Sequence, residues 1–133
     1  MSGGLVFPDA RSCLQDLIDG TEHLGREVTC VWHLVVEEGK LAGPFPLVQI
    51  ITAPGTEGFL DRVDPVTLEC YAEGNLARDV LESIKAMICG VAIETDSGYL
   101  DKIAVTSTPD DVYYTNTLNK AFATFDVTSR PVS

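Results

Sequence analysis

Apolar residues recur at helical spacing in two segments of the chain. The first segment, residues 8–19, opens with a proline and an aspartate that suit a first helical turn, and its stripe consists of Cys13, Leu14, Leu17 and Ile18. The second segment, residues 75–89, carries the stronger stripe, formed by Leu76, Val80, Leu81, Ile84, Met87 and Ile88. The pattern therefore predicts two amphipathic helices, each followed by a glycine.

Alternation of apolar and polar residues predicts about five strands. They are expected over residues 27–36, 47–52, 65–73, 99–105 and 121–128. The first is apolar on both faces, which is typical of a central strand, and the third has the pattern of a half-buried strand. Pro109 and the two aspartates after it predict a turn. Because the helices are too few to alternate with the strands, we expect an α+β fold: a mixed sheet flanked by two helices, in a single domain over residues 1–133.

The composition is that of an acidic globular domain. Of the 133 residues, 45% are hydrophobic and 22% are charged, and the net charge is −11. Affinity for nucleic acid depends on cationic side chains that displace counterions, so a phosphate-tracking groove is not expected, and anionic membranes are disfavoured for the same reason. The chain contains no apolar run with the length of a signal sequence or a bilayer span, so we expect a soluble protein.

Few residues are arranged as catalysis requires. Four cysteines stand far apart among apolar neighbours, which favours reduced thiols in the core over disulfides. His23, in a polar loop, is expected on the surface, and His33, in a strand, is expected to pack or to lie at an interface. We therefore expect no enzyme and no catalytic, metal or cofactor site. The enzymatic alternative is a small hydrolase that uses a thiol or a carboxylate, with Cys30 or Cys70 near His33.

Acidic pairs do not change this expectation. Neighbouring carboxylates occur at residues 37–38, at 61 and 64, and at 110–111, as chance allows in so acidic a chain. The segment over residues 94–98 resembles half of a calcium loop, but it lacks the third early ligand and the closing glutamate. A simple turn is the preferred interpretation.

Apolar side chains in loops provide the candidate binding residues. The loops over residues 37–46 and 54–64 are rich in glycine, proline and acids, and two tyrosines follow the predicted turn. Large apolar side chains in such places are common at protein contacts, and folding back onto the domain is an equal alternative. The candidate interface consists of Leu41, Phe45, Phe59, Leu60, Tyr113 and Tyr114.

The order of these motifs along the chain is similar to that of a family of phage proteins. The segments that carry the likeness are Phe7–Ala10, Pro46–Ile50, Asp61–Asp64, Cys70–Gly74, Ala77–Val80 and Phe125–Arg130. Over about residues 5–130, the chain resembles the tail terminator, or tail-completion, proteins of long-tailed bacteriophages, especially those that infect actinobacteria. Other head-to-tail connector and neck proteins share much of the pattern and remain an alternative.

The resemblance implies a structural virion protein rather than an enzyme. Such proteins form a hexameric ring on the last ring of the tail tube, end tube polymerisation and join the tail to the head. The implied partners are other copies of the chain, the major tail tube protein and a head or neck connector protein. The implied location is the head-proximal end of the virion tail, and the host cytoplasm during assembly. A module that binds a cytosolic partner is a third possibility.

A ring of acidic subunits also implies an acidic lumen. DNA would pass through such a lumen without specific binding, because like charges repel within a Debye length of about 8 Å at physiological salt. The candidate acids for the lumen or its loops are Glu37, Glu38, Glu57, Asp61 and Asp64.

Overall fold

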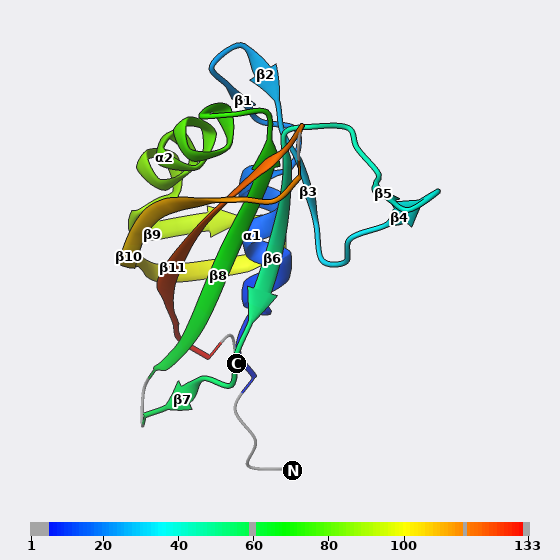
Figure 1. Cartoon of the computed structure of the whole chain (residues 1–133). Coiled ribbons are helices and arrows are strands. Elements are labelled where there is room, and N and C mark those ends of the chain that lie inside the picture. Colours follow the sequence, from blue (N-terminus) through cyan, green and yellow to red (C-terminus); the bar gives the residue numbers. More distant parts are fainter. Residues whose placement is uncertain (1–5, 59–60, 116, 132–133) are drawn as a thin grey trace.

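One mixed sheet of seven strands organises the chain in the computed structural model, which describes residues 6–58, 61–115 and 117–131 (Figure 1). The strand order is β3-β6-β8-β11-β10-β9, with β7 also beside β8, and β3 and β6 are parallel while the other pairs are antiparallel. The predicted α+β class is confirmed, with seven strands in place of about five. The strands are β3 (Thr29–Val31), β6 (Leu47–Thr52), β7 (Thr56–Glu57), β8 (Arg62–Ala72), β9 (Gly90–Thr95), β10 (Gly98–Tyr113) and β11 (Asn119–Ser129).

Two helices, α1 (Ala10–Ile18) and α2 (Leu76–Ile88), cover one face of this sheet, as Figure 1 shows. Both were predicted, with small differences at their ends. The first begins two residues later than expected, because Asp9 is its N-cap and accepts a hydrogen bond from the Arg11 amide at 3.1 Å. Met87, expected in the buried stripe of the second helix, is instead 44% exposed.

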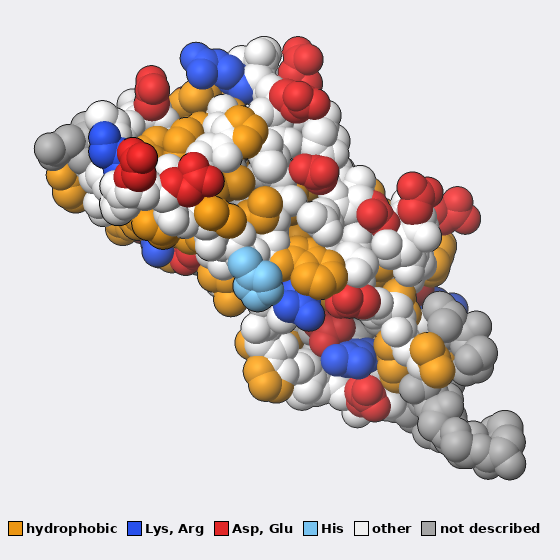
Figure 2. Space-filling view, turned by 90° about the vertical axis from the view of Figure 1, so that its right-hand side faces the viewer, with side chains coloured by type: hydrophobic (Ala, Val, Ile, Leu, Met, Phe, Trp, Pro, Cys, Tyr) orange, Lys and Arg blue, Asp and Glu red, His pale blue; other side chains and the backbone are white. Residues whose placement is uncertain are grey.

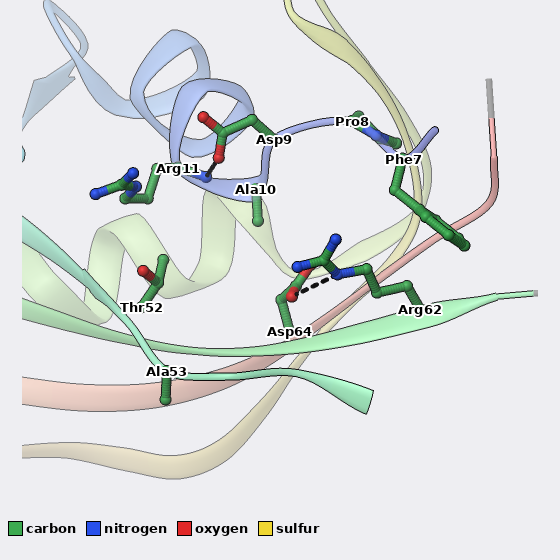
Figure 3. Close-up of a pocket in the computed structure, with 9 residues that line it drawn as sticks. All are labelled: Phe7, Pro8, Asp9, Ala10, Arg11, Thr52, Ala53, Arg62 and Asp64. Atoms are coloured by element: carbon green, nitrogen blue, oxygen red, sulfur yellow. Dashed lines mark hydrogen bonds and ion pairs between the residues drawn. The ribbon is translucent and has the colours of Figure 1, made fainter. Parts of the chain in front are cut away.

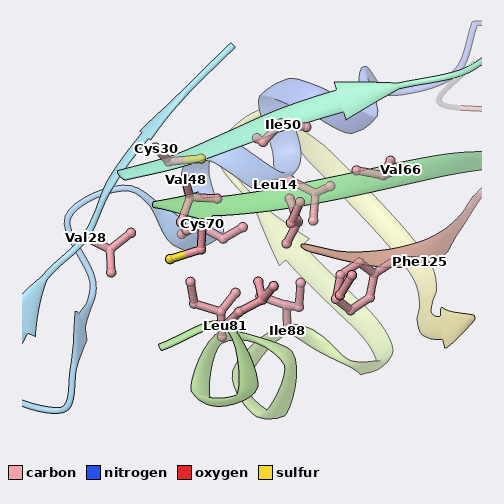
Figure 4. Close-up of a cluster of buried hydrophobic side chains, with 14 of the residues drawn as sticks. Leu14, Val28, Cys30, Val48, Ile50, Val66, Cys70, Leu81, Ile88 and Phe125 are labelled. Carbon is pink, nitrogen blue, oxygen red and sulfur yellow. The ribbon is translucent and has the colours of Figure 1, made fainter. Parts of the chain in front are cut away.

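The hydrophobic core lies between the helices and the inward side chains of the central strands. Alternate residues of β8 and β11 point inward, and Val66 stands opposite Phe125 in their register. Figure 4 shows Phe125 and Val66 converging with Leu14 of α1 and Leu81 of α2. Burial of such side chains stabilises the fold by roughly 1.5–3 kcal/mol each. Among the described residues, no helix covers the opposite face of the sheet, which includes the cross-strand pair Thr67 and Thr124.

The strand predicted over residues 27–36 is shorter than expected and lies at an edge. Only Thr29–Val31 join the sheet, as β3, and the chain then leaves the sheet. Two side chains, one in α1 and one at its C-terminal end, form hydrogen bonds with the outer edge of this strand. Asp19 Oδ1 accepts from the Cys30 amide at 2.9 Å, and Gln15 Nε2 donates to the Cys30 carbonyl at 3.0 Å. The predicted central position is therefore wrong, because helix side chains replace the neighbouring strand.

The predicted turn at residues 109–111 is also wrong. Strand β10 runs through these residues, with register shifts between Val105 and Ser107 and between Ser107 and Asp110. Such bulges allow β10 to include Pro109, which has no backbone N–H to donate, and still pair with β11 before and after it. The turn before β10 lies earlier in the chain and connects this strand to β9, a strand that was not predicted. In this turn, Thr95 Oγ1 accepts a hydrogen bond from the Gly98 amide at 3.1 Å. Residues 94–98 thus include a turn, as preferred.

Two small hairpins were not predicted. The first, β1 (Glu22–His23) with β2 (Arg26–Glu27), packs against α2. His23 is only 4% exposed, so its predicted surface position is wrong: the hairpin folds its ring onto Ser83 of α2. The second hairpin, β4 (Val36–Glu37) with β5 (Lys40–Leu41), projects away from the sheet on the side opposite α2 (Figure 1).

Candidate functional site

The projecting hairpin forms an arm, defined here as residues 35–45. Glu38 and Gly39 make its turn with φ values of 52° and 76°, and two consecutive positive φ values suit the right-handed twist of a two-residue hairpin. At the base of the arm, the Ala42 amide donates to the Val35 carbonyl at 2.8 Å. The arm is therefore an ordered hairpin with a ladder of only two residue pairs.

A groove separates the arm from the turn between β10 and β11. Its volume is about 540 Å³, and its walls are largely apolar, with one lysine and one glutamate. We term it the arm groove; it is lined by Val36, Gly39, Lys40, Leu41, Phe45, Glu73, Tyr114, Thr115, Thr117 and Leu118. Large apolar residues in a groove of this kind are typical of protein contacts.

The wall opposite the arm is held in place by hydrogen bonds and ring packing. The Thr115 amide donates to the Leu118 carbonyl at 2.9 Å, which closes the turn. The Tyr114 ring meets the buried Tyr71 ring edge-on, with 5.0 Å between centroids. Burial raises the pKa of the Tyr71 hydroxyl, and nearby Glu69, which accepts a hydrogen bond from it at 3.1 Å, raises that pKa further.

The structure brings together three of the six predicted interface residues. Leu41, Phe45 and Tyr114 all line the arm groove, although they come from segments about seventy residues apart in the sequence. Tyr113 ends β10 and is 71% exposed. Phe59 and Leu60 lie outside the described residues.

Sequence reasoning missed Val36 and Leu118 as lining residues. Val36 ends the segment over residues 27–36, which was predicted to form one continuous strand. The glutamates, lysine and glycine that follow it were a usable signal, because they mark the tip of a hairpin rather than a loop. Leu118 had no comparable signal, since it is an isolated apolar residue among polar ones.

The five predicted lumen acids fall into two separate groups. Glu37 and Glu38 lie exposed at the tip of the arm, which precedes β6. Glu57, Asp61 and Asp64 lie beyond the other end of that strand, in or beside β7 and the start of β8. Asp64 is 6% exposed, so its assignment to a solvent-facing loop is wrong.

Asp64 belongs instead to a second hollow, of about 340 Å³, between the start of α1 and the ends of β6 and β8 (Figure 3). Its Oδ1 accepts from Arg62 Nε at 3.0 Å, and Arg62 Nη1 lies 3.6 Å from a Glu57 carboxylate oxygen. Arg11 stacks over the Trp32 ring at 4.5 Å. The charged groups of this hollow are thus largely engaged with neighbours in the fold.

The thiols of Cys30 and Cys70 are poorly suited to act as nucleophiles beside His33. All four cysteines are free, as predicted, and burial raises the pKa of both Cys30 and Cys70 to about 12. A thiol with such a pKa stays protonated at neutral pH and is a poor nucleophile. His33 is exposed, whereas these thiols are buried. Among the described residues, no three His, Cys, Asp or Glu side chains form a group that could hold a metal ion.

The surface on the arm side carries acidic side chains over much of its area. Figure 2 shows red acidic side chains scattered over this face, including its upper and right-hand edges, with hydrophobic side chains and a few basic ones between them.

Comparison with known proteins does not assign a family. Neither protein-family models nor curated proteins match this chain. Within the described residues, no helix has the length and apolar character needed to cross a membrane. What the protein does is therefore inferred from its surfaces.

Proposed function

We propose that this chain is a structural subunit of a long-tailed phage virion. Copies of it form a hexameric ring on the end of the tail tube, stop tube polymerisation and join the tail to the head. The observation that carries the proposal is the projecting arm with the apolar groove beneath it.

The arm has the properties of a segment that docks on a partner. A two-stranded hairpin is at best marginally stable in water, and this one has only two residue pairs. Its apolar residues Val35 and Val36 are 56% and 64% exposed. Covering such surface contributes roughly 25 cal/mol per Å² of apolar area, so docking would stabilise both the arm and the assembly.

A structural role also agrees with the chemistry of the domain. Buried thiols with raised pKa values and charged groups engaged in ion pairs suit a stable building block. The net charge of −11 and the exposed acids at the arm tip favour a ring that does not retain DNA. The protein would then reside at the head-proximal end of the tail.

Light scattering coupled to size exclusion, with and without tail tubes, tests the proposal. We expect a particle of about six times 14.4 kDa that binds one end of the tubes. A neck or connector ring would give a similar mass but would not bind the tube end. A monomer at every concentration, even with tubes present, would contradict the proposal.

A further inference from the structure

The edges of the main sheet differ in how they are protected. Asp19 and Gln15 bond the backbone of β3 at Cys30, which occupies that edge. The part of β10 that extends beyond its pairing with β9 contains two register shifts and Pro109, features that hinder the addition of another strand at an edge. Among the described residues, the outer edge of β9 has neither side chains bonded to its backbone nor register shifts with a proline. Within the described chain, no backbone hydrogen bond is made to this edge.

The start of β9 is an open, uncharged segment beside a cation. Val91 is 70% exposed, and Met87 nearby on α2 is 44% exposed. Gly90 and Val91 pair with Ile103 and Lys102 of β10, and Ala92 beside them has φ at 57°. Lys102 is the cross-strand partner of Val91, is exposed, and makes no ion pair with any described residue.

The arm matches this segment in length and charge. Its strands are two residues long, and Val36 and Leu41 are apolar cross-strand partners. Glu37 and Glu38 at its tip make no ion pair within the described chain. The arm and β9 lie on opposite sides of the domain (Figure 1), so one copy cannot join them within itself.

We propose that the arm of one copy docks on Gly90 and Val91 of the next copy and adds a strand to its open edge. The backbone groups of β9 gain partners, the valines pack together, and Glu37 and Glu38 face Lys102. The contact joins two different patches, so it repeats head to tail and closes into a ring when the rotation allows. This inference rests on the self-association proposed above and names the surfaces that produce it.

Charge reversal in two separate variants tests this contact. The arm variant carries Glu37→Lys and Glu38→Lys, and the edge variant carries Lys102→Glu; Arg26→Glu, on the exposed β2, is the matched control. Each of the first two variants should raise the concentration for half-assembly roughly tenfold or more, while the control assembles like the wild type. Circular dichroism and urea unfolding verify that each variant is folded.

Mixing the two variants supplies the decisive result. In an alternating ring, every reversed arm meets a reversed edge and every native arm meets a native edge, so an equal mixture should regain wild-type assembly. Variants that assemble as well alone as the wild type, or a mixture no better than its components, would overturn the arm contact while leaving the ring itself intact. A wild-type protein that forms no ring even with tubes would instead overturn the proposed function, and the contact with it.

Discussion

His23 Nδ1 lies 2.7 Å from Ser83 Oγ, and this contact ties the β1–β2 hairpin to helix α2. On the other side of the ring, Nε2 lies 2.9 Å from Thr21 Oγ1, whose own hydroxyl donates to the Ile18 carbonyl at 2.6 Å. Because the Thr21 hydrogen is already used, His23 Nε2 donates to Thr21, and in the neutral ring Nδ1 accepts from Ser83. The geometry therefore places the hydrogen of the neutral ring on Nε2.

Stability should fall in mild acid because of His23. Burial lowers the pKa of His23 below its ordinary value of 6.5. Between the lowered pKa and 6.5, the unfolded chain therefore binds more protons at this residue than the folded chain does. The free energy of unfolding should decrease as the pH falls below about 6.5 toward the lowered pKa. Urea unfolding between pH 7.5 and 5.5 measures this. A His23→Gln variant should have a flatter profile, and an unchanged slope in that variant would contradict the prediction.

Alkylation of the native protein should spare the core cysteines. Cys30 and Cys70 are buried, and their pKa of about 12 leaves little thiolate at pH 7.5. Cys89 is partly exposed and should react first, although its pKa is also raised by burial. Mass spectrometry after a short exposure to maleimide measures the order. Labelling of Cys70 at the rate of a free thiol would show that the core is open and would revive a thiol-based activity.

Truncation of Phe125 should be the more costly of two matched changes in β11. Phe125 is 1% exposed and lies within the core, whereas Phe122 points to the uncovered face of the sheet. Phe125→Ala should lower the free energy of unfolding by about 3–5 kcal/mol through lost burial and a residual cavity. Phe122→Ala should cost clearly less. Equal losses in urea unfolding would mean that the open face is covered in solution.

Polar substitution in the arm groove should abolish the ring without unfolding the subunit. Leu41→Ser and Phe45→Ser remove apolar surface from a partly exposed groove and leave the main core intact. Light scattering should give a monomer for both, and urea unfolding of the monomer should shift by less than about 1.5 kcal/mol. Leu24→Ser, at an exposed site on the other hairpin, should form rings normally. Intact rings in the arm variants would remove the arm from the assembly interface.

The sequence predicted the elements whose signal is local. Both helices and strands β6, β8 and β11 follow from periodicity, because one side of each is buried against the same core. The short β3 could not be predicted in this way, since its edge is bonded by Asp19 and Gln15 from another element. The run through Pro109 was mistaken for a turn because bulges, which have no simple sequence signature, keep the strand paired.

The candidate site was predicted in its residues rather than in its arrangement. Leu41, Phe45 and Tyr114 were chosen as apolar residues in loops. The groove joins them because Tyr114, packed on Tyr71 of β8, lies beside the arm. Asp64 was wrongly assigned to a loop, because β8 already includes Arg62 and Asp64, whose side chains pair within the strand. Long-range pairing decides such positions.

The length of tail tubes grown with and without this protein tests the central claim most directly. Tube protein polymerised alone should give a broad distribution of lengths in electron micrographs. Addition of the purified chain during growth should shorten the tubes in proportion to its concentration and place a ring at one end. Tubes that elongate unchecked, with both ends bare at saturating concentrations of the chain, would contradict the account.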